Sequence, residues 1–448
     1  MIERRSGMRD DGAPSRSLSL TVREQERYKR EAMVLYRLLV SAVFLPVCAM
    51  FLARCVKGEE RWRDFAQRFG LSHVPTNNRA QTLWLHAASN GELNSVLPLL
   101  SRLRDRGMQM SILITCNSVT GVRLAEENGY VAQLAPLDFR WSQTRFLKTH
   151  GISTHVTIES EIWPNRIHAL HARGIPCIVL GARLSATSLR KWQRVQKIAK
   201  HSLEKVSFFS AQDSQSKDRY MTLGLRPEAV GVTLNLKSLF QTKTPELARS
   251  ARANTCLAAS THPQEDELIL EAFKTARESW PKLRLILAPR HPKRAADLSA
   301  AIKKFGFRHV SRSASGSFDT DKHDILLADT LGEMDRWYAQ SGICIIGGTF
   351  QSHGGHTPYE PAAYGCAILH GPKVENFQPE FTALRETKAS KLCDTSQSLA
   401  AALLELQEGD VQDEKAQISR ETLSLNGNVD QLFDEILNTV QPRPRNPS

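Results

Sequence analysis

The sequence has no CxxC pair, no close cluster of cysteine and histidine, and no GxxxxGK[ST] motif. The first two absences argue against a structural zinc site, and the third argues against a P-loop. The eight cysteines are scattered one at a time, and several lie inside apolar runs such as residues 343–346. This distribution is typical of buried free thiols in a reducing compartment.

Extremes of composition are also missing. Hydrophobic residues make up 41% of the chain and charged residues 24%, while glycine (25) and proline (20) are close to average usage. This balance excludes collagen-like, coiled-coil, wholly disordered and polytopic membrane proteins. A chain of 448 residues is too long for one typical domain, so we expect two domains of about 200 residues each.

Acidic residues are fewer than basic residues. The chain has 47 acidic residues against 59 Lys and Arg, which gives a formal net charge of +12. This excess favours an anionic partner: nucleic acid, phospholipid headgroups or a phosphorylated substrate. Charge alone does not choose among the three.

The N-terminal region changes abruptly in composition. Residues 1–32 are polar and Arg-rich, which predicts a flexible basic tail. Residues 38–53 carry no charge, contain Pro46 and are bounded by Arg37 and Arg54. These 16 residues are fewer than the roughly 20 that a helix needs to cross a bilayer. We therefore expect residues 33–57 to form an anchor embedded in the membrane or lying on it, with a buried core helix as the alternative.

Short apolar runs alternate with amphipathic stretches through the rest of the chain, which is the pattern of a parallel sheet with crossover helices. In the first half they predict strands at residues 83–87, 112–115, 155–158, 177–180 and 206–209. In the second half they predict strands at residues 255–259, 283–288, 324–327, 343–346 and 367–369. We expect two doubly wound α/β domains, residues 58–240 and 241–448, whose ligands lie in a cleft at the carboxyl ends of the strands.

Polar side chains follow the predicted strands of the first half. Ser89 and Glu92 stand where the first strand gives way to a helix, so Glu92 either complements the helix dipole or acts as a general base. Glu159 and Glu161 follow the third strand, beside Trp163. If the strand continues through them, both acids point to the same side and form a wall of a sugar site. If the strand ends before them, that inference lapses.

The second half repeats this arrangement. Ser260 follows a strand and precedes an acidic helix start, so it is either a cap or a ligand-binding residue. Arg290 ends the next strand, where a guanidinium can clamp a phosphate or merely cap the sheet. The segment GGTFQSHGGHTPYEP offers close backbone approach and the N–H groups of a helix start, which favours an anion or a ribose. A metal site at His353 and His356 is disfavoured because glycines separate them and no Cys or Asp is near.

Taken together, the motifs resemble the bacterial 3-deoxy-D-manno-octulosonic acid (Kdo) transferases of lipid A assembly. The matching segments stand in the family's order over most of residues 33–380: YRLL, WLHAASNGE, PLD, ESEIWPN, ARLS, NLK, ASTHPQE, APRHPKR, DTLGEM, GGTFQSHGGHTPYEP and GPKVENF. The resemblance implies a GT-B fold, in which two Rossmann-like domains face a cleft, with an N-terminal membrane-anchor helix.

The resemblance also implies an activity. The protein would be an inverting glycosyltransferase that needs no metal or cofactor and moves Kdo from CMP-Kdo to a lipid A precursor. It would work at the cytoplasmic face of the bacterial inner membrane, with membrane lipids rather than nucleic acid as its other partner. Glu92 would be the general base. The acceptor side would be lined by Ser89, Gly91, Glu159 and Glu161. The donor side would be lined by Lys237, Ser260, Arg290, Gly332, Glu333, Gly354, Gly355, His356, Glu360 and Asn376.

Four positions depart from the family's usual pattern: Ser160, Ile162, Leu234 and Thr357. Thr357 stands where an Asn is usual, and it removes an amide that could bond the cytidine or the sugar. Two alternatives stay open. One is another GT-B enzyme that uses a UDP sugar, and the other is a non-catalytic, membrane-peripheral binder of anionic lipid or nucleic acid.

Overall fold

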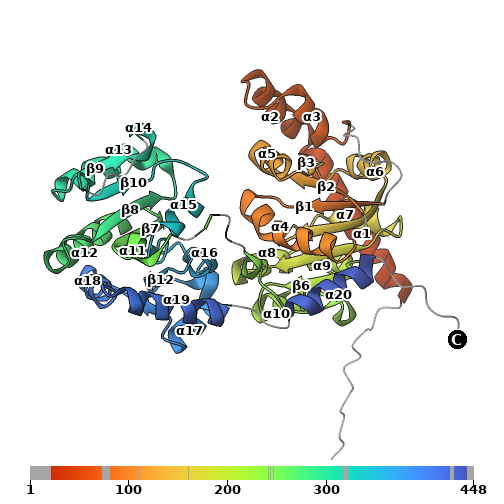
Figure 1. Cartoon of the computed structure of the whole chain (residues 1–448). Coiled ribbons are helices and arrows are strands. Elements are labelled where there is room, and N and C mark those ends of the chain that lie inside the picture. Colours follow the sequence, from red (N-terminus) through yellow and green to blue (C-terminus); the bar gives the residue numbers. More distant parts are fainter. Residues whose placement is uncertain are drawn as a thin grey trace, which may run out of the picture. The chain divides into compact units, whose positions relative to one another are not determined.

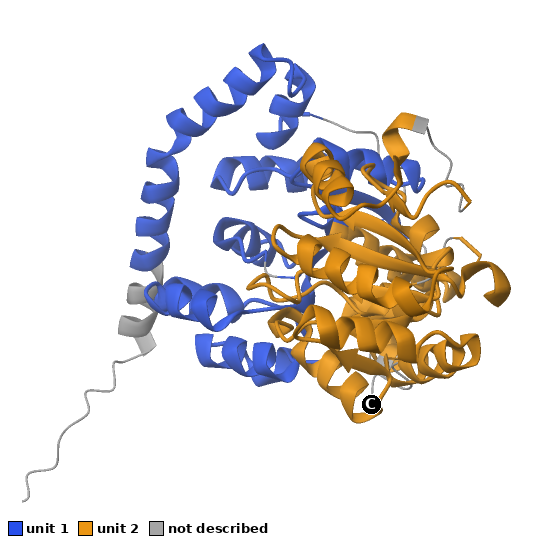
Figure 2. Cartoon of the chain, turned by 90° about the vertical axis from the view of Figure 1, so that its left-hand side faces the viewer, with its two compact units in different colours: residues 1–90, 109–231, 438–448 blue, residues 91–108, 232–437 orange. Residues whose placement is uncertain are grey.

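The computed structural model describes residues 22–72, 81–108, 110–159, 161–240, 242, 244–245, 247–315, 321–423 and 428–440. The chain divides into two compact units (Figure 2). Unit 1 comprises residues 1–90, 109–231 and 438–448, and unit 2 comprises residues 91–108 and 232–437. The main division falls at residue 232, against residue 241 in the prediction. The segment 91–108, which carries Glu92, groups with unit 2 rather than with the first domain.

Unit 1 contains a six-stranded sheet in the order β3-β2-β1-β4-β5-β6, and the paired strands are parallel (Figure 1). The strands are β1 (Thr82–His86), β2 (Ser111–Cys116), β3 (Val131–Leu134), β4 (Ile152–Ile158), β5 (Cys177–Ala182) and β6 (Phe208–Ala211). The helices of this part of the chain are α5 (Val119–Glu127), α6 (Arg140–Thr149), α7 (Pro164–His171), α8 (Ala186–Gln193), α9 (Gln196–Leu203), α10 (Ser214–Leu223) and the 3₁₀ turn η1 (Pro227–Ala229). The chain winds outward from β1 to β3 and returns with β4 beside β1. The carboxyl ends of β1 and β4 therefore adjoin where the winding reverses, which is the usual place for a ligand in such sheets.

Three helices precede this sheet: α1 (Val22–Ala42), α2 (Phe44–Val56) and α3 (Trp62–Arg68). Residues 22–32 are helical, so the prediction of a flexible tail over residues 1–32 is wrong for that part, and residues 1–21 lie outside the described residues. Pro46 lies in the first turn of α2, where its missing N–H removes no helical hydrogen bond. This explains why the apolar segment tolerates a proline.

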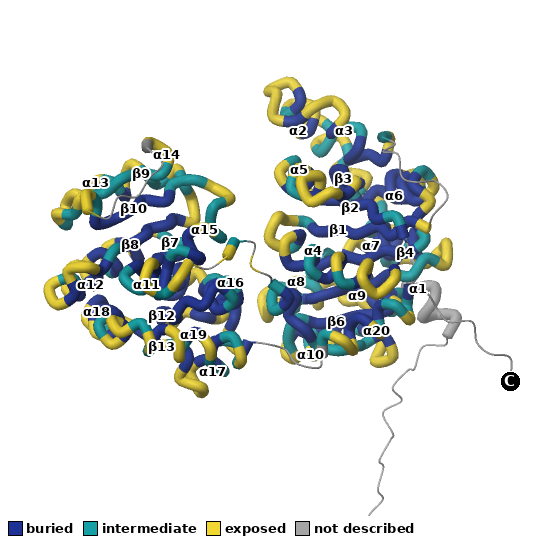
Figure 3. Tube along the Cα trace, in the orientation of Figure 1, coloured by how far each residue is buried: buried dark blue, intermediate teal, exposed yellow. Residues whose placement is uncertain are grey.

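The segment Glu31–Val56 is long and apolar enough to cross a membrane, by length and composition, and only 6% of its most apolar window is buried. This low burial argues against the alternative of a core helix. The exposed apolar side chains of α1 and α2, part of which are yellow in Figure 3, include Val34, Leu35, Leu38, Leu39, Val43, Leu45, Met50, Leu52 and Val56.

Unit 2 contains a seven-stranded sheet in the order β13-β12-β11-β7-β8-β10-β9, and its paired strands are also parallel. The strands are β7 (Thr255–Thr261), β8 (Arg284–Pro289), β9 (His309–Ser311), β10 (Ile325–Leu327), β11 (Ile343–Ile346), β12 (Ala367–His370) and β13 (Ser390–Leu392). The helices and 3₁₀ turns are α4 (Asn90–Asp105), η2 (Leu236–Leu239), α11 (Arg249–Arg252), α12 (Glu265–Ser279), η3 (Pro292–Arg294), α13 (Ala295–Lys304), α14 (Arg312–Ser315), α15 (Met334–Ala339), α16 (Tyr359–Ala363), η4 (Glu375–Phe377), α17 (Gln378–Glu386), α18 (Ser396–Glu405), α19 (Gly409–Leu423) and α20 (Asn428–Val440).

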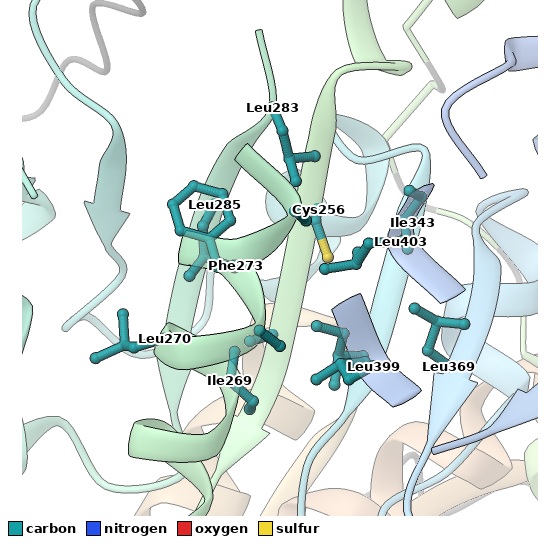
Figure 4. Close-up of a cluster of buried hydrophobic side chains, with 14 of the residues drawn as sticks. Cys256, Ile269, Leu270, Phe273, Leu283, Leu285, Ile343, Leu369, Leu399 and Leu403 are labelled. Carbon is teal, nitrogen blue, oxygen red and sulfur yellow. The ribbon is translucent and has the colours of Figure 1, made fainter. Parts of the chain in front are cut away.

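The core of unit 2 lies on both faces of its sheet. Cys256 and Ala258 of β7 pack with α12 and α18 in one buried cluster, part of which is drawn in Figure 4. Leu257 and Ala259, the alternate residues of the same strand, pack in a second cluster with α15, α16 and α17. Because successive side chains of a strand point to opposite faces, the two clusters show that helices cover both faces of the sheet.

All ten predicted strands are present in the structure. The sequence did not predict β3, β9 and β13, and each of these strands lies at an edge of its sheet. No residue of β9 or β13 is fully buried, so neither strand carries the continuous apolar run that marks a strand covered on both faces.

Gly347, directly after β11, provides a test of backbone packing in unit 2. A Cβ at this position would lie 2.5 Å from the carbonyl oxygen of Ser260 and 2.6 Å from that of Ala259. We expect Gly347→Ala to lower the free energy of unfolding by about 1–3 kcal/mol, because the backbone of β7 must shift. Gly409→Ala is the matched control, because its nearest atoms belong to the movable side chain of Arg249. Equal denaturation midpoints for the two variants would show that the backbone of β7 accommodates the added methyl group without cost.

Candidate active site

A cavity of about 290 Å³ lies within unit 2. One part of its wall is the start of α4, and another is the turn η2 with Phe240. The rest comes from the end of β7, from the segments that follow β8 and β11, and from α15 and α16. Its lining residues are Gly91, Asn94, Ser95, Lys237, Phe240, Ser260, Arg290, Tyr338, His356, Thr357, Tyr359 and Glu360. Six predicted site residues are therefore brought together: Gly91, Lys237, Ser260, Arg290, His356 and Glu360.

Positive charge enters the cavity from two elements. Arg290 follows β8, and its backbone N–H donates to the carbonyl oxygen of Thr261, 3.0 Å away. Lys237 lies in η2, where Asn235 caps the turn by accepting the Lys237 N–H at 3.1 Å. The Lys237 ammonium lies 4.9 Å from the centre of the Phe377 ring, a cation–π contact that orients it. Two cations in one cavity suit an anionic ligand.

A buried carboxylate holds two loops of this site together. Glu265, the first residue of α12, is fully buried. One of its carboxylate oxygens accepts the N–H groups of His262 and Gly348, both at 2.8 Å, and the other accepts the N–H of Phe350 at 2.9 Å. A buried carboxylate is stable only when hydrogen-bond donors replace its lost hydration. The loop after β7 and the loop after β11 supply these donors, so both loops are fixed to the Glu265 side chain.

The glycine-rich segment after β11 uses its backbone groups internally. The Gly355 N–H donates to the Gly348 carbonyl at 2.8 Å, and the His356 N–H donates to the Gly347 carbonyl at 3.2 Å. Asn376 donates its side-chain amide to the carbonyl oxygens of His353 and Gly355. The N–H groups of Gly355 and His356 are therefore used within the segment, whereas the predicted N–H groups of a helix start belong to α16, which begins at Tyr359.

Histidines gather beside this loop. The Nε2 atoms of His262 and His356 are 3.0 Å apart, so one of them donates a proton to the other. The ring of His353 stacks on that of His262, with 4.0 Å between the ring centres. Burial lowers the pKa of both His262 and His356 to about 4, and the neighbouring histidines and Arg290 act in the same direction. Both rings are therefore neutral near pH 7. Among the described residues, no group of three or more His, Cys, Asp or Glu side chains could hold a metal ion.

Gly332 and Glu333 lie after β10 and do not line this cavity. The Glu333 carboxylate accepts hydrogen bonds from the guanidinium of Arg312 at 2.8 and 3.0 Å and from the Thr330 hydroxyl. These bonds hold the pKa of Glu333 below its usual range. Glu333 thus forms an ion pair with a strand-end arginine in the present structure.

The acid pair of unit 1 is arranged differently from the alternating-strand prediction. β4 ends at Ile158, and Glu159 has a left-handed backbone with φ of 58°, so the inference that Glu159 and Glu161 point to the same side lapses. Ser160 lies outside the described residues. Glu161 lies 3.3 Å from Nε2 of His86, the last residue of β1, and accepts a hydrogen bond from Trp163.

His86 links Glu161 to Thr115. His86 is fully buried, and burial lowers its pKa to about 4, so the ring is neutral at pH 7. Its Nε2–H donates to Glu161, while its Nδ1 lies 3.0 Å from the Thr115 hydroxyl. Burial raises the pKa of Glu161, but the bonds from His86 and Trp163 outweigh it and bring the pKa down to about 2. Glu161 is therefore an oriented, ionised acceptor.

Sequence reasoning missed His86, His262 and Glu265 as parts of the sites. His86 and His262 lie inside the quoted motifs WLHAASNGE and ASTHPQE, and Glu265 ends the second of them. The sequence shows the acidic start of this helix but assigns Glu265 no role of its own. The only sequence signal for Glu265 was its position at the first residue of a helix that follows a strand. That signal does not reveal its hydrogen-bond partners Gly348 and Phe350, because they are distant in sequence.

Residues 63–239 match the family model described as 3-deoxy-D-manno-octulosonic-acid transferase (kdotransferase). The chain is 31% identical over 355 residues to the 3-deoxy-D-manno-octulosonic acid transferase of Haemophilus influenzae, covering 77% of this chain and 83% of that one. It is 32% identical to the enzyme of the same name from Bordetella pertussis, covering 71% and 78%. The chain belongs to the Kdo transferase family.

Solved structures identify the fold. A glycosyltransferase from Rickettsia africae is 9% identical, with a TM-score of 0.54 over 81% of this chain and 98% of that one. The UDP-GlcNAc 2-epimerase of Neisseria meningitidis is 13% identical, with a TM-score of 0.57 over 81% and 100%. These likenesses show the GT-B fold, and family membership makes this Kdo transferase a glycosyltransferase enzyme.

The buried His86 predicts how stability depends on pH. Its pKa of about 4 in the folded protein lies below the usual value, so the unfolded chain binds more protons and stability falls as pH drops from about 6.5 to 4. Glu161, with its pKa near 2, adds a loss only below about pH 4.5. We expect His86→Gln to reduce the loss in unfolding free energy between pH 7 and pH 5 by about 2 kcal/mol.

The measurement is urea denaturation of the wild type and the variant at both pH values. Exposed His171 on α7, changed to Gln, is the control and should alter the pH dependence much less. An identical pH dependence in the wild type and His86→Gln would show that His86 is not the group responsible.

Proposed function

We propose that the protein transfers Kdo from CMP-Kdo to a hydroxyl group of a lipid A precursor, with inversion and without a bound metal ion. The observation that carries this proposal is the cavity of unit 2. It combines two cations, Lys237 and Arg290, with the start of the helix that bears Glu92. This combination supports a site in which an anionic donor and a catalytic base would meet.

The donor would lie against the segments that follow β7, β8 and β11. CMP-Kdo carries one phosphate and the Kdo carboxylate, so two cations match its charge. Arg290 suits the phosphate because a planar guanidinium can bond two of its oxygens, and Lys237 supplies a point charge. As CMP leaves, these cations stabilise the charge that develops on the phosphate. The hydroxyl of Ser260 and the carboxylate of Glu360 would hold the sugar or the nucleoside.

Glu92 would act as the general base. It lies in the first turn of α4, next to Gly91, which lines the cavity. The carboxylate takes the proton of the acceptor hydroxyl while the acceptor oxygen forms a bond to the anomeric carbon of Kdo. The bond from that carbon to the phosphate breaks at the same time, and CMP departs with the electron pair. Attack opposite the leaving group gives inversion.

The acceptor side would be formed by Ser89, Gly91, Glu159 and Glu161. The exposed apolar side chains of α1 and α2 would hold the protein at the inner membrane, where an acylated acceptor lies. Basic residues close to these helices, among them Arg54 and Lys57, suit anionic lipid headgroups. We place the two sheets on the cytoplasmic side of that membrane.

The decisive experiment is mass spectrometry of a lipid A precursor incubated with purified protein, CMP-Kdo and EDTA. A mass increase of one or more Kdo units is expected, and the spectrum also counts the additions. Product that forms only with added Mg²⁺ would contradict the metal-free donor site. Product that forms with a UDP sugar and not with CMP-Kdo would contradict the choice of donor.

Glu92→Gln tests the base. We expect kcat to fall by about 10²–10⁴-fold, because the amide cannot accept the proton. Binding of CMP-Kdo, followed by thermal shift, should stay close to wild type. Glu126→Gln on α5 is the control, since Glu126 is exposed and lies outside the cavity. Full activity of Glu92→Gln would remove Glu92 from the mechanism.

Arg290→Ala tests the donor site. Loss of a charge-assisted hydrogen bond to the phosphate should raise the KM for CMP-Kdo by about 10–100-fold. The KM for the acceptor should change little. Lys293→Ala, at an exposed position three residues further on, is the matched control and should have a KM for CMP-Kdo near that of the wild type. A KM for CMP-Kdo that is unchanged in Arg290→Ala would place the phosphate elsewhere.

A further inference from the structure

A buried carboxylate in unit 1 connects the apolar helix α1 to the start of α7. Asp138 accepts the N–H groups of Asn165 at 2.9 Å and Arg166 at 2.8 Å, which are the second and third residues of α7. Its Oδ2 also accepts the hydroxyl proton of Tyr36, from α1, at 2.8 Å. Asp138 is 7% exposed, so these three donors replace the water that the carboxylate has lost.

A second bond joins the same two helices. Nε of Arg37 donates to Oδ1 of Asn165 at 3.2 Å, and the side-chain amide of Asn165 donates to the carbonyl oxygen of Asp138 at 2.6 Å. Two consecutive residues of α1 are thus bonded to one junction, which we call the Asp138 junction (Tyr36, Arg37, Asp138, Asn165 and Arg166). One bond reaches Asp138 and the other reaches Asn165, so together they hold α1 against the start of α7.

The opposite face of α1 is apolar and exposed. Val34, Leu35, Leu38 and Leu39 are each 52–63% exposed, and at 100° per residue they lie away from Tyr36 and Arg37. If these side chains insert into a bilayer, the Asp138 junction therefore lies at a defined distance from the bilayer surface.

Helix α7 connects the Asp138 junction to the segment that we propose lines the acceptor site. α7 begins at Pro164, directly after Trp163, whose indole N–H bonds the Glu161 carboxylate. Glu161 in turn bonds His86 at the end of β1. The segments that carry YRLL, PLD and ESEIWPN are thus parts of one hydrogen-bonded assembly.

We propose that Tyr36 is a positioning residue that sets the height and orientation of the Glu161 segment relative to the bilayer surface, so that a membrane-embedded acceptor reaches it. This inference rests on the proposed function. Tyr36 touches no reacting atom, and it acts through Asp138 and α7.

Tyr36→Phe isolates this role. The two backbone N–H groups continue to hold Asp138 at the start of α7, so the variant loses the bond to α1 and keeps the cap. A purely structural role would reduce activity on every acceptor alike. A positioning role reduces it only when the acceptor lies in a bilayer.

The experiment compares two acceptors with CMP-Kdo as donor. One is the lipid A precursor embedded in phosphatidylethanolamine–phosphatidylglycerol vesicles, and the other is its deacylated, water-soluble phosphorylated disaccharide. For Tyr36→Phe we expect the KM for the vesicle-embedded acceptor to rise by about 10–100-fold, the loss expected for one hydrogen bond to a charged group. The KM for CMP-Kdo, kinetics on the soluble acceptor and sedimentation with vesicles should match the wild type. Arg37→Gln should change the same parameter in the same direction.

Leu38→Ser, on the exposed face of the same helix, is the contrasting control: it should weaken sedimentation with vesicles. Unchanged kinetics of Tyr36→Phe on vesicles, or equal losses on both acceptors, would overturn the positioning role while the wild type remains active. No product from the wild type with either acceptor would instead count against the proposed function.

Discussion

Both units depend on buried carboxylates that accept backbone N–H groups. In unit 2, Glu265 accepts three such groups and joins the loops after β7 and β11. In unit 1, Asp138 accepts two at the start of α7 and a third donor from Tyr36. A carboxylate removed from water is stable only when every lost hydration bond is replaced, so each acid fixes all the segments that supply a donor. The loops that carry the candidate chemistry are therefore held in place before any ligand binds.

The parallel sheets determine where these loops meet. Every strand of a parallel sheet ends at the same edge, so residues that are far apart in sequence converge there. Ser260 lies at the end of β7, Arg290 follows β8 and His356 follows β11, and these three strands are neighbours in the sheet of unit 2. In unit 1 the same constraint brings His86, from the end of β1, to Glu161, after β4. The sheet topology thus explains why these residues meet, and the buried acids explain why the loops that carry them are held in place.

The sequence predicted what depends on local pattern and missed what depends on distant partners. Strands buried on both faces are continuous apolar runs, and these runs predicted the nine inner strands and one buried edge strand, β6; the missed strands all lie at edges. Arg290 and Lys237 were predicted from charge at strand ends and from the family's motifs. Glu265 was not, because an acid at the start of a helix has the same local pattern whether it complements the dipole or anchors a loop 83 residues away. The sequence also did not predict the left-handed backbone of Glu159. This conformation ends the strand, so Glu159 and Glu161 do not point to the same side as expected.

A place within a family motif does not make a residue a ligand contact. Asn376 and Glu265 stand in such motifs, and in this structure both hold loops. Thr357 shows the converse. It departs from the usual Asn yet lines the cavity, and its hydroxyl oxygen accepts the N–H of Tyr359 at 3.3 Å, at the start of α16. The Thr357 hydroxyl therefore bonds the first N–H of α16, although Pro358 is the N-cap residue of that helix. A threonine carries a methyl group and a hydroxyl where an asparagine carries an amide, so this departure from the motif changes the chemistry of the cavity wall.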